Sequence, residues 1–219
     1  MRSQFADKFN HDDDALKYDR DVLNEFNPIR AGYENLLNWV AAEAAIDNSN
    51  VVLDLGSGTG NLALRLKLFR ELVCVDISKE MLQIAQNKLS YCNNITWDKE
   101  DILEYFYKTK KTYDVIVSAY AIHHLTDDEK VLLLKKIGQA LNPNGRAVFG
   151  DLMFGNEMKK EQFVKTCLQS GREKLAKEIK DEFFWNVEST TKILQGLGFQ
   201  VITKQFSELS WGIAARKTG

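Results

Sequence analysis

The residues with the clearest chemical meaning belong to, or directly follow, an apolar segment of strand length, Val51–Leu55. The segment carries one acid, Asp54, and glycines follow it at alternate positions, Gly56, Gly58 and Gly60. Glycine has no Cβ, so a loop built from it can approach a ligand closely and take positive φ. A helix that begins just after such a loop presents free N–H groups to anionic parts of a ligand. The pattern predicts a pocket for a nucleotide-like ligand at the carboxyl end of a parallel strand.

The spacing of the glycines argues against a dinucleotide and hence against a nucleotide-dependent oxidoreductase. The dinucleotide pattern is G-x-G-x-x-G, whereas here the third glycine comes one residue earlier and Asn61 follows it. A carboxylate at Asp54 would also repel a pyrophosphate. S-adenosylmethionine suits this acid better, because its sulfonium and ammonium groups outweigh its single carboxylate.

Two further acids follow predicted strands. Asp76 closes the segment Leu72–Val75, and Asp101 comes shortly after Ile95–Trp97. Asp76 stands twenty positions after Gly56, where a ribose-binding acid is expected in units of this kind. The order of glycine loop, acid and acid predicts that successive strands contribute to one ligand site.

Five pieces of the chain, in this order, resemble the class I S-adenosylmethionine-dependent methyltransferases over roughly residues 34–216. The pieces are Asp54-x-Gly56-x-Gly58-x-Gly60, Asp76-Ile77 with Met81, Glu100-Asp101-Ile102, the strand Tyr113–Ser118 with the following Ala119–Leu125, and the turn Leu141–Gly145 before the strand Arg146–Phe149. The chain as a whole is most similar to small uncharacterised bacterial members of that family.

The resemblance implies that S-adenosylmethionine is the cofactor, with Asp76 on its ribose hydroxyls and Asp101 on its adenine amino group. The full set of contacts that it implies is Asp54, Gly56, Ser57, Gly58, Gly60, Asp76, Ile77, Met81, Asp101, Ile102 and Ala119. Met81 and Ile102 would wall the adenine, although such residues serve equally well in a hydrophobic core. Tyr18 would fold over the cofactor, as aromatic lid residues do in relatives.

Strand-like and helix-like segments alternate, which predicts an α/β fold with a mostly parallel sheet covered by helices on both faces. The resemblance implies a Rossmann-like class I methyltransferase fold with seven strands in the order 3-2-1-4-5-7-6, the seventh antiparallel. The predicted helices cover residues 33–45, 62–69, 126–141, 157–181 with an interruption near Ser170-Gly171, and 187–197, and a further helix begins after Ser78. Ser78 is a predicted N-cap, and Thr126–Glu129 is a predicted capping box.

Length and composition fit a single methyltransferase domain over residues 1–219, which are 44% hydrophobic. We expect an N-terminal lid and helical segment (1–45), a cofactor-binding core (46–150), a helical insertion over the acceptor site (151–186) and a C-terminal helix and hairpin (187–219). The net charge of −2 gives no general attraction to nucleic acid or to an acidic membrane. The three cysteines form no C-x-x-C, and no leading hydrophobic segment resembles a secretion signal. We therefore expect a cytoplasmic protein, with its oligomeric state left open.

Methyl transfer is an in-line displacement that needs alignment of donor and acceptor and no covalent intermediate. A general base is needed only if the acceptor must lose a proton early. The candidates are His123, His124 and Tyr120. The sequence does not choose among them.

We expect no metal. Adjacent histidines point apart on a strand or a helix, the only other histidine is His11, and no spaced ligand set completes a site. The charged run Arg172–Glu182 is interpreted as a solvated helix face. The aromatic run Phe183–Trp185 behind it would pack on the core or wall the acceptor pocket.

The leading acceptor class is a small molecule, neutral or weakly charged, under a lid formed by the segment around Tyr18 and the insertion Glu157–Trp185. In relatives that methylate adenine or glutamine, an Asn/Asp-Pro-Pro-aromatic turn follows the fourth strand; here Ser118–Ala121 stands in that place, and no Pro-Cys nucleophile occurs. The alternatives are a methyltransferase acting on tRNA or protein and a non-catalytic S-adenosylmethionine-binding module.

Overall fold

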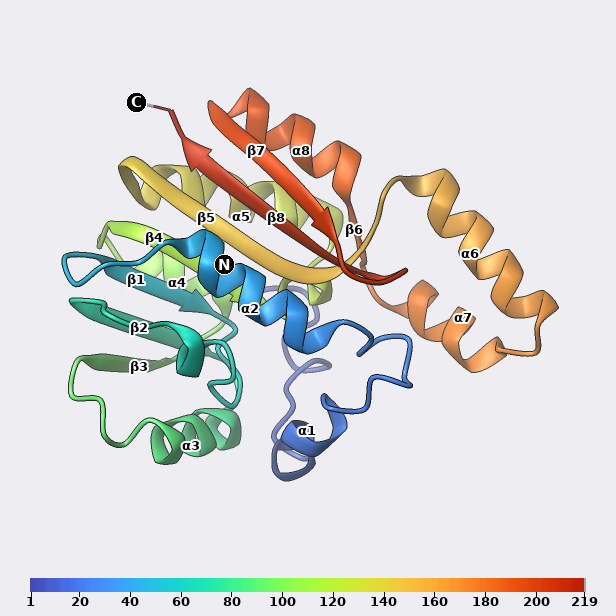
Figure 1. Ribbon diagram of the computed structural model, residues 1–219, viewed down its shortest axis with the longest axis horizontal. Helices are drawn as coiled ribbons and strands as arrows, with labels where there is room; N and C mark the ends of the chain where they lie inside the picture. Colours follow the sequence, from blue (N-terminus) through green and yellow to red (C-terminus); the bar gives the residue numbers. More distant parts are fainter. Residues whose placement is uncertain (219) are drawn as a thin grey trace.

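A central sheet organises the molecule (Figure 1), and the computed structural model describes residues 1–218. Its strands are β1 (Val51–Leu55), β2 (Glu71–Asp76), β3 (Ile95–Lys99), β4 (Tyr113–Ala119), β5 (Leu141–Phe154), β6 (Trp185–Asn186), β7 (Phe199–Gln205) and β8 (Ser210–Lys217). The strand order is β3-β2-β1-β4-β5-β8-β7, with the short β6 paired to the end of β5. β8 runs antiparallel to both of its neighbours, β5 and β7, whereas the other strand pairs are parallel. Without β6, this is the predicted order, so the expected fold class is confirmed.

Helices cover both faces of the sheet. They are α1 (Ala15–Asp21), α2 (Tyr33–Ala44), α3 (Lys79–Lys88), α4 (Ile102–Lys108), α5 (Asp127–Ala140), α6 (Glu157–Gln169), α7 (Glu173–Asp181) and α8 (Val187–Gly196), with short 3-10 turns η1 (Ala63–Arg65) and η2 (Ile122–His124). Alternate residues of β1 enter two hydrophobic cores. Val52 joins the core under α2, and Leu53 joins the core under α4, α5 and α8. All five β1 residues are buried, as a central parallel strand requires.

Two glycines let α2 lie close to the sheet. A Cβ at Gly150 of β5 would lie 2.7 Å from Val40, and one at Gly212 of β8 would lie 2.1 Å from the Trp39 ring. Neither position tolerates a side chain without displacement of α2. The packing therefore fixes α2 across β4, β5 and β8.

The predicted helix over Leu62–Phe69 is wrong. Only the turn Ala63–Arg65 is helical, Leu66 is extended, and Leu68 has φ +64°. The connection from β1 to β2 covers residues 56–70, and the glycine loop uses its first part, so too little chain remains for a helix. The buried Leu62, Ala63 and Leu66 pack as a compact turn instead, and no long helix here offers its N-terminus to a ligand.

The predicted caps are confirmed. The Ser78 hydroxyl accepts a hydrogen bond from Met81 N at 3.0 Å, and Thr126 and Glu129 form a reciprocal capping box. The helical insertion breaks at Gly171, whose φ is +71°. The predicted turn Leu141–Gly145 is absorbed into β5 as an irregular start of the strand.

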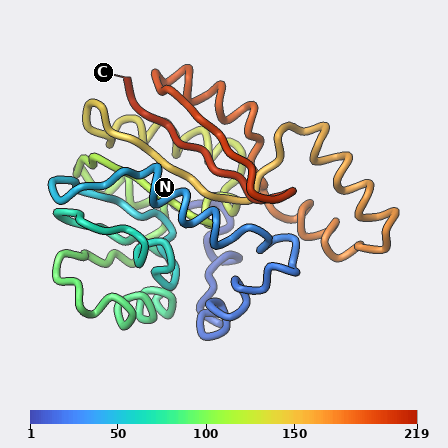
Figure 2. The backbone as a smooth tube through the Cα atoms, in the orientation of Figure 1, coloured from blue at the N-terminus to red at the C-terminus, as the bar shows by residue number. Residues whose placement is uncertain are grey.

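The N-terminal lid, residues 1–30, lies across the carboxyl ends of the strands, between α3 and α7 (Figure 2). Its polar ties are Ser3 to Asp101, Gln4 to Glu129, Asp12 to Ser78, and Asp19 to Thr59. Its fully buried apolar residues are only Ala6, Ala15 and Val22. Among residues 1–218, no helix has the length and apolarity needed to cross a bilayer.

Candidate cofactor and acceptor site

One cavity of about 310 Å³ gathers nearly all of the predicted site residues at the carboxyl ends of the strands. The predicted residues that line it are Tyr18, Asp54, Gly56, Ser57, Gly58, Asp76, Ile77, Met81, Asp101, Ile102, Ala119, Tyr120, His123 and His124. Gly60 does not line it. We call the part around Asp54, Gly58 and Asp76 the glycine-loop end. The part around His11, His123, His124 and Glu182, together with Asp151 next to His123, is the histidine end.

The three glycines of the loop have different surroundings, although all have positive φ. A Cβ at Gly56 would lie 2.2 Å from the Ala121 Cβ, and one at Gly60 would lie 3.1 Å from the Ala85 Cβ. A Cβ at Gly58 would meet no atom within 4 Å. Gly56 and Gly60 therefore allow close packing, whereas Gly58 leaves space that a ligand can fill.

Asp54 is a buried acid that lacks a partner. Its exposed fraction is 0%, and neither carboxylate oxygen has a hydrogen-bond partner among the described residues. Burial, helped by the nearby Asp76, raises the pKa of Asp54 to about 8. An unpaired buried carboxylate is costly. A cation entering this cavity would relieve that cost.

Asp76, at the end of β2, is held by backbone donors. One oxygen accepts from Gly58 N at 2.7 Å, and the other accepts from Ser78 N at 2.8 Å. Burial raises the pKa of Asp76 to about 6, against the opposing effect of these hydrogen bonds. Each oxygen keeps a further lone pair that can accept a ligand hydroxyl.

The Asp101 carboxylate already accepts two sets of hydrogen bonds. One of its oxygens caps α4 by accepting from Leu103 N and Glu104 N, each at 3.0 Å. The lid residue Ser3 donates to the same carboxylate from its backbone N–H and from its hydroxyl. A ligand group reaching Asp101 would share this acid with Ser3.

Aromatic rings and one cation line the wall between the two ends of the cavity. The Arg30 guanidinium lies 5.4 Å from the Tyr18 ring centroid and 5.8 Å from that of Tyr120. The Tyr120 hydroxyl lies 3.0 Å from the Ser210 hydroxyl, and burial raises the pKa of Tyr120 well above its ordinary value. Tyr120 therefore keeps its proton near neutrality, which weakens it as a candidate base.

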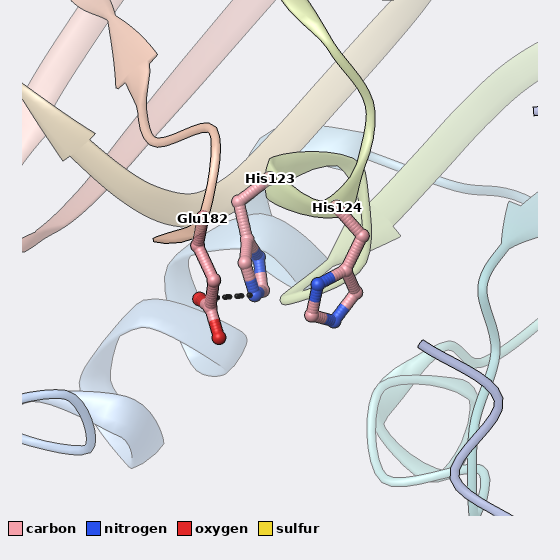
Figure 3. Close-up of side chains that lie close together, drawn as sticks. All are labelled: His123, His124 and Glu182. Atoms are coloured by element: carbon pink, nitrogen blue, oxygen red, sulfur yellow. Dashed lines mark ion pairs between the residues drawn. The ribbon is translucent and has the colours of Figure 1, made fainter. Parts of the chain in front are cut away.

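The histidine end is organised by Asp151, which lies within β5. One of its oxygens is 2.5 Å from His123 Nδ1, and the other accepts from His123 N at 3.0 Å and from Trp185 Nε1 at 3.1 Å. In the neutral imidazole, the contact with Asp151 favours the His123 tautomer with the proton on Nδ1, which leaves the lone pair on Nε2. That Nε2 lies 3.6 Å from a Glu182 carboxylate oxygen (Figure 3).

The expectation that the adjacent histidines point apart is wrong. They stand on the tight turn η2, and their ring centroids are only 4.0 Å apart. Phe9 of the lid stacks on His124 at 4.1 Å, and His11 Nε2 lies 3.4 Å from His124 Nε2. Burial, followed by the charge of His123, lowers the pKa of both His124 and His11. All three histidines of the sequence thus meet in one place.

Two other interpretations of the sequence are resolved here. The charged run Arg172–Glu182 is not only a solvated face, because Glu178 and Glu182 line the cavity. Phe184 and Trp185 are buried in the hydrophobic cores and do not line the cavity. Sequence reasoning missed Glu182 and Arg30, and it gave Asp151 no part in binding or in proton transfer. An acid in an apolar strand was the available signal for Asp151.

Comparison with known sequences gives consistent matches. A family profile described as a methyltransferase domain matches residues 52–145. An uncharacterized methyltransferase from Bacillus cereus is 32% identical over 212 residues, which cover 96% of this chain and 95% of the relative. A relative from Bacillus mycoides, also named an uncharacterized methyltransferase, matches with the same identity and coverage.

Solved structures with the same fold include two that hold S-adenosylhomocysteine. The magnesium protoporphyrin IX methyltransferase from Synechocystis aligns with a TM-score of 0.68 at 18% identity, covering 95% of this chain and 96% of that one. The N-methyltransferase NodS from Bradyrhizobium japonicum aligns with a TM-score of 0.65 at 17% identity, covering 96% and 100%. At these identities the likeness shows the fold.

Proposed function

Because the chain belongs to the S-adenosylmethionine-dependent methyltransferase family, we propose that it methylates a small molecule bound beside His123. The observation that carries the proposal is that the glycine-loop end and His123 line one shared cavity. The N-terminal lid and α7 cover this space, which suits a small acceptor better than a polymer. A protoporphyrin methyltransferase among the structural neighbours is named for an acceptor of this class.

The residues of the glycine-loop end fit S-adenosylmethionine. Asp54 offers an unpaired buried carboxylate for the ammonium group, and Gly58 leaves room for the methionine portion. Asp76 keeps free lone pairs for the ribose hydroxyls, while Met81 and Ile102 supply apolar surface for the adenine. When bound, the cofactor supplies a methyl carbon activated by a positively charged sulfur. The rest of the chemistry is alignment, exclusion of water and movement of a proton.

We assign to His123 the role of general base, which takes the proton that the methyl acceptor loses. Its Nε2 carries a lone pair that faces the cavity, because Asp151 holds the proton on Nδ1. An acceptor hydroxyl or thiol would pass its proton to Nε2 as the bond to the methyl carbon forms, whereas an acceptor ammonium group would pass its proton to Nε2 before that bond forms. Asp151 would then stabilise the imidazolium and hold its orientation, as the third member of a triad does. Glu182, 3.6 Å from Nε2, would add a second negative charge.

The test compares His123→Gln and Asp151→Asn with the unmodified protein. Each is incubated with S-adenosylmethionine and a panel of small hydroxyl, thiol and amino acceptors, and S-adenosylhomocysteine formation is measured. Removing a general base costs roughly 10²–10⁴-fold in rate, and we expect losses on that scale with unchanged affinity for S-adenosylhomocysteine. Asp114→Asn is the matched control. This acid accepts a hydrogen bond from Val51 N at the start of β1, so it lies at the end of the sheet opposite to the cavity.

Other outcomes would redirect the assignment. If His123→Gln transferred methyl groups at the wild-type rate, His123 would not be the general base. Transfer to tRNA or protein but to no member of the panel would replace the acceptor class. Tight cofactor binding without turnover on any acceptor would favour the non-catalytic module.

A reducing, cytoplasmic setting is part of the proposal, supported by the free thiols of all three cysteines.

A further inference from the structure

The histidine end presents three ligand atoms of the kind that transition metals prefer. His123, His124 and Glu182 each offer one atom, and these atoms lie within 4.8 Å of one another. Figure 3 shows the three side chains converging, two from η2 and one from the segment after α7. A modest closing movement would bring them to the separations of a tetrahedral site, whose metal–ligand bonds are about 2.0–2.2 Å.

Asp151 adds the outer support that metal-binding histidines usually have. Such histidines donate their second ring N–H to a carboxylate, which fixes the tautomer and aims the other nitrogen at the metal. His123 makes this contact through Nδ1 at 2.5 Å, and Trp185 Nε1 and three backbone N–H groups hold Asp151 in turn. In the neutral His123 imidazole, Nε2 is therefore the nitrogen that carries the lone pair.

His124 contributes an independent observation. Its Nδ1 is buried and has no hydrogen-bond partner among the described residues. Its Nε2 lies 3.4 Å from His11 Nε2. When His124 donates from Nε2 to His11, Nδ1 carries a lone pair that no protein group uses. A buried polar atom left in this state calls for a partner.

The charges around the three groups suit a divalent cation. Asp151 and Glu178 add negative charge near the two imidazoles and Glu182, whereas Arg30 and Lys8 are the opposing cations.

We propose that His123 Nε2, His124 Nδ1 and the Glu182 carboxylate bind one divalent first-row transition-metal ion, such as Zn²⁺. Two imidazoles and one carboxylate favour zinc, cobalt or nickel over magnesium or calcium, which prefer oxygen ligands. Three protein ligands leave one position open toward the cavity.

The inference depends on the proposed function in one respect: the ion and the acceptor's proton compete for the same lone pair on His123. The loaded protein should therefore bind the cofactor but transfer methyl groups poorly.

The binding test uses the full chain, freed of metal by a chelator and titrated with Zn²⁺ at neutral pH in a calorimeter. We expect one ion per chain, and a Co²⁺-loaded sample with the intense visible absorption of four-coordinate cobalt. His124→Gln and Glu182→Gln should each weaken zinc binding at least about tenfold, the lower end of what loss of even an outer-shell partner costs. Glu173→Gln, an exposed acid of the same helix α7 outside the cavity lining, and Cys92→Ser are the matched controls and should keep the wild-type affinity. Thermal unfolding without metal confirms that each variant is folded.

The zinc-binding measurements and the rate measurements test the metal site and its competition with catalysis separately. No zinc binding, or binding that survives both ligand variants, overturns the site. A rate of methyl transfer that falls with added Zn²⁺ and returns with chelator supports the competition at His123, and a rate that rises with Zn²⁺ overturns it. The calorimetric result requires no turnover. It therefore stands or fails independently of whether the chain methylates a small molecule.

Discussion

The glycine-loop end and the histidine end share one cavity but are held in place by different means. At the glycine-loop end, Asp54 and Asp76 stand at the ends of buried strands, and their positions are fixed by the sheet. At the histidine end, only His123, His124 and Asp151 come from the core, whereas His11 and Glu182 come from segments that cover it. The first end is held by the sheet, and a bound cation would favour the ionised form of Asp54 there. The second is assembled when its covers are in place. Cofactor binding and methyl transfer should therefore be separable by mutation.

The largest expected effect tests that separation directly. Removing residues 1–20 takes away Tyr18, His11 and the stacking of Phe9 on His124, but it leaves the sheet and nearly all of both cores. We expect methyl transfer to be lost while the domain stays folded, as measured by product formation and by thermal unfolding.

Limited proteolysis gives the supporting measurement. Residues 1–30 hold few buried apolar anchors, so the lid should open at low free-energy cost and be cleaved readily in the free protein. S-adenosylhomocysteine should protect it. Full activity after truncation, or equal cleavage in both states, would mean that the lid takes no part in the reaction.

The next effect is confined to the glycine-loop end. Asp76→Ala removes the hydrogen bonds that we propose this acid makes to the ribose, which are worth about 1.5–3 kcal/mol when the acceptor is charged. This corresponds to roughly a 10–100-fold loss of affinity for S-adenosylhomocysteine by calorimetry. Asp98→Ala, on the neighbouring strand β3 but outside the cavity lining, is the control. An affinity that changes less than about twofold, well under 1 kcal/mol, would refute the ribose contact.

A smaller effect concerns the pH dependence of cofactor affinity. The pKa of Asp54 is raised to about 8, so this acid is largely protonated in the free protein at neutral pH. An ammonium group bound beside it favours the ionised form, so binding must release a proton below that pH. Affinity should rise as the pH approaches about 8 and then level off. Asp54→Asn should flatten this slope, which calorimetry in buffers of different ionisation enthalpy would reveal.

The smallest effect tests the link between the two ends. Ser3 of the lid donates to Asp101, which is the predicted partner of the adenine amino group. Ser3→Ala removes one hydroxyl hydrogen bond, a change of about 0.5–1.5 kcal/mol. We expect cofactor affinity to rise a few-fold if Ser3 competes with adenine for Asp101. A fall in affinity would show that Ser3 instead holds the lid closed over the cofactor.

The glycine-loop end could be predicted from the sequence because its parts are local. Asp54, Asp76 and Asp101 each stand at, or within two residues of, the end of a strand, and apolar segments mark those strands. Parallel strands bring their carboxyl ends to one edge, so three local patterns sufficed to place one site. The same local logic failed at Leu62–Phe69, because periodicity ignores how little chain connects β1 to β2.

The histidine end could not be predicted in this way. His11 and His124 are separated by 113 positions, and no local pattern connects them. Glu182 lies in a charged run, and which of its acids face inward depends on how α7 docks. The tight turn η2 turns the adjacent rings toward one side, whereas a regular strand or helix would separate them. Each of these facts is set by tertiary packing.

The position of β8 has a consequence for the order in which the molecule is completed. This strand follows every other described strand in sequence, yet it lies between β5 and β7. During synthesis on the ribosome, the β5 residues that later pair with β8 emerge as a bare edge, which can pair with another chain. Asp151 faces Trp211 across that pairing. The backbone of Asp151, whose carboxylate contacts His123, therefore gains its β8 partner only after Trp211 has been added, so activity should appear only once β8 has paired with β5.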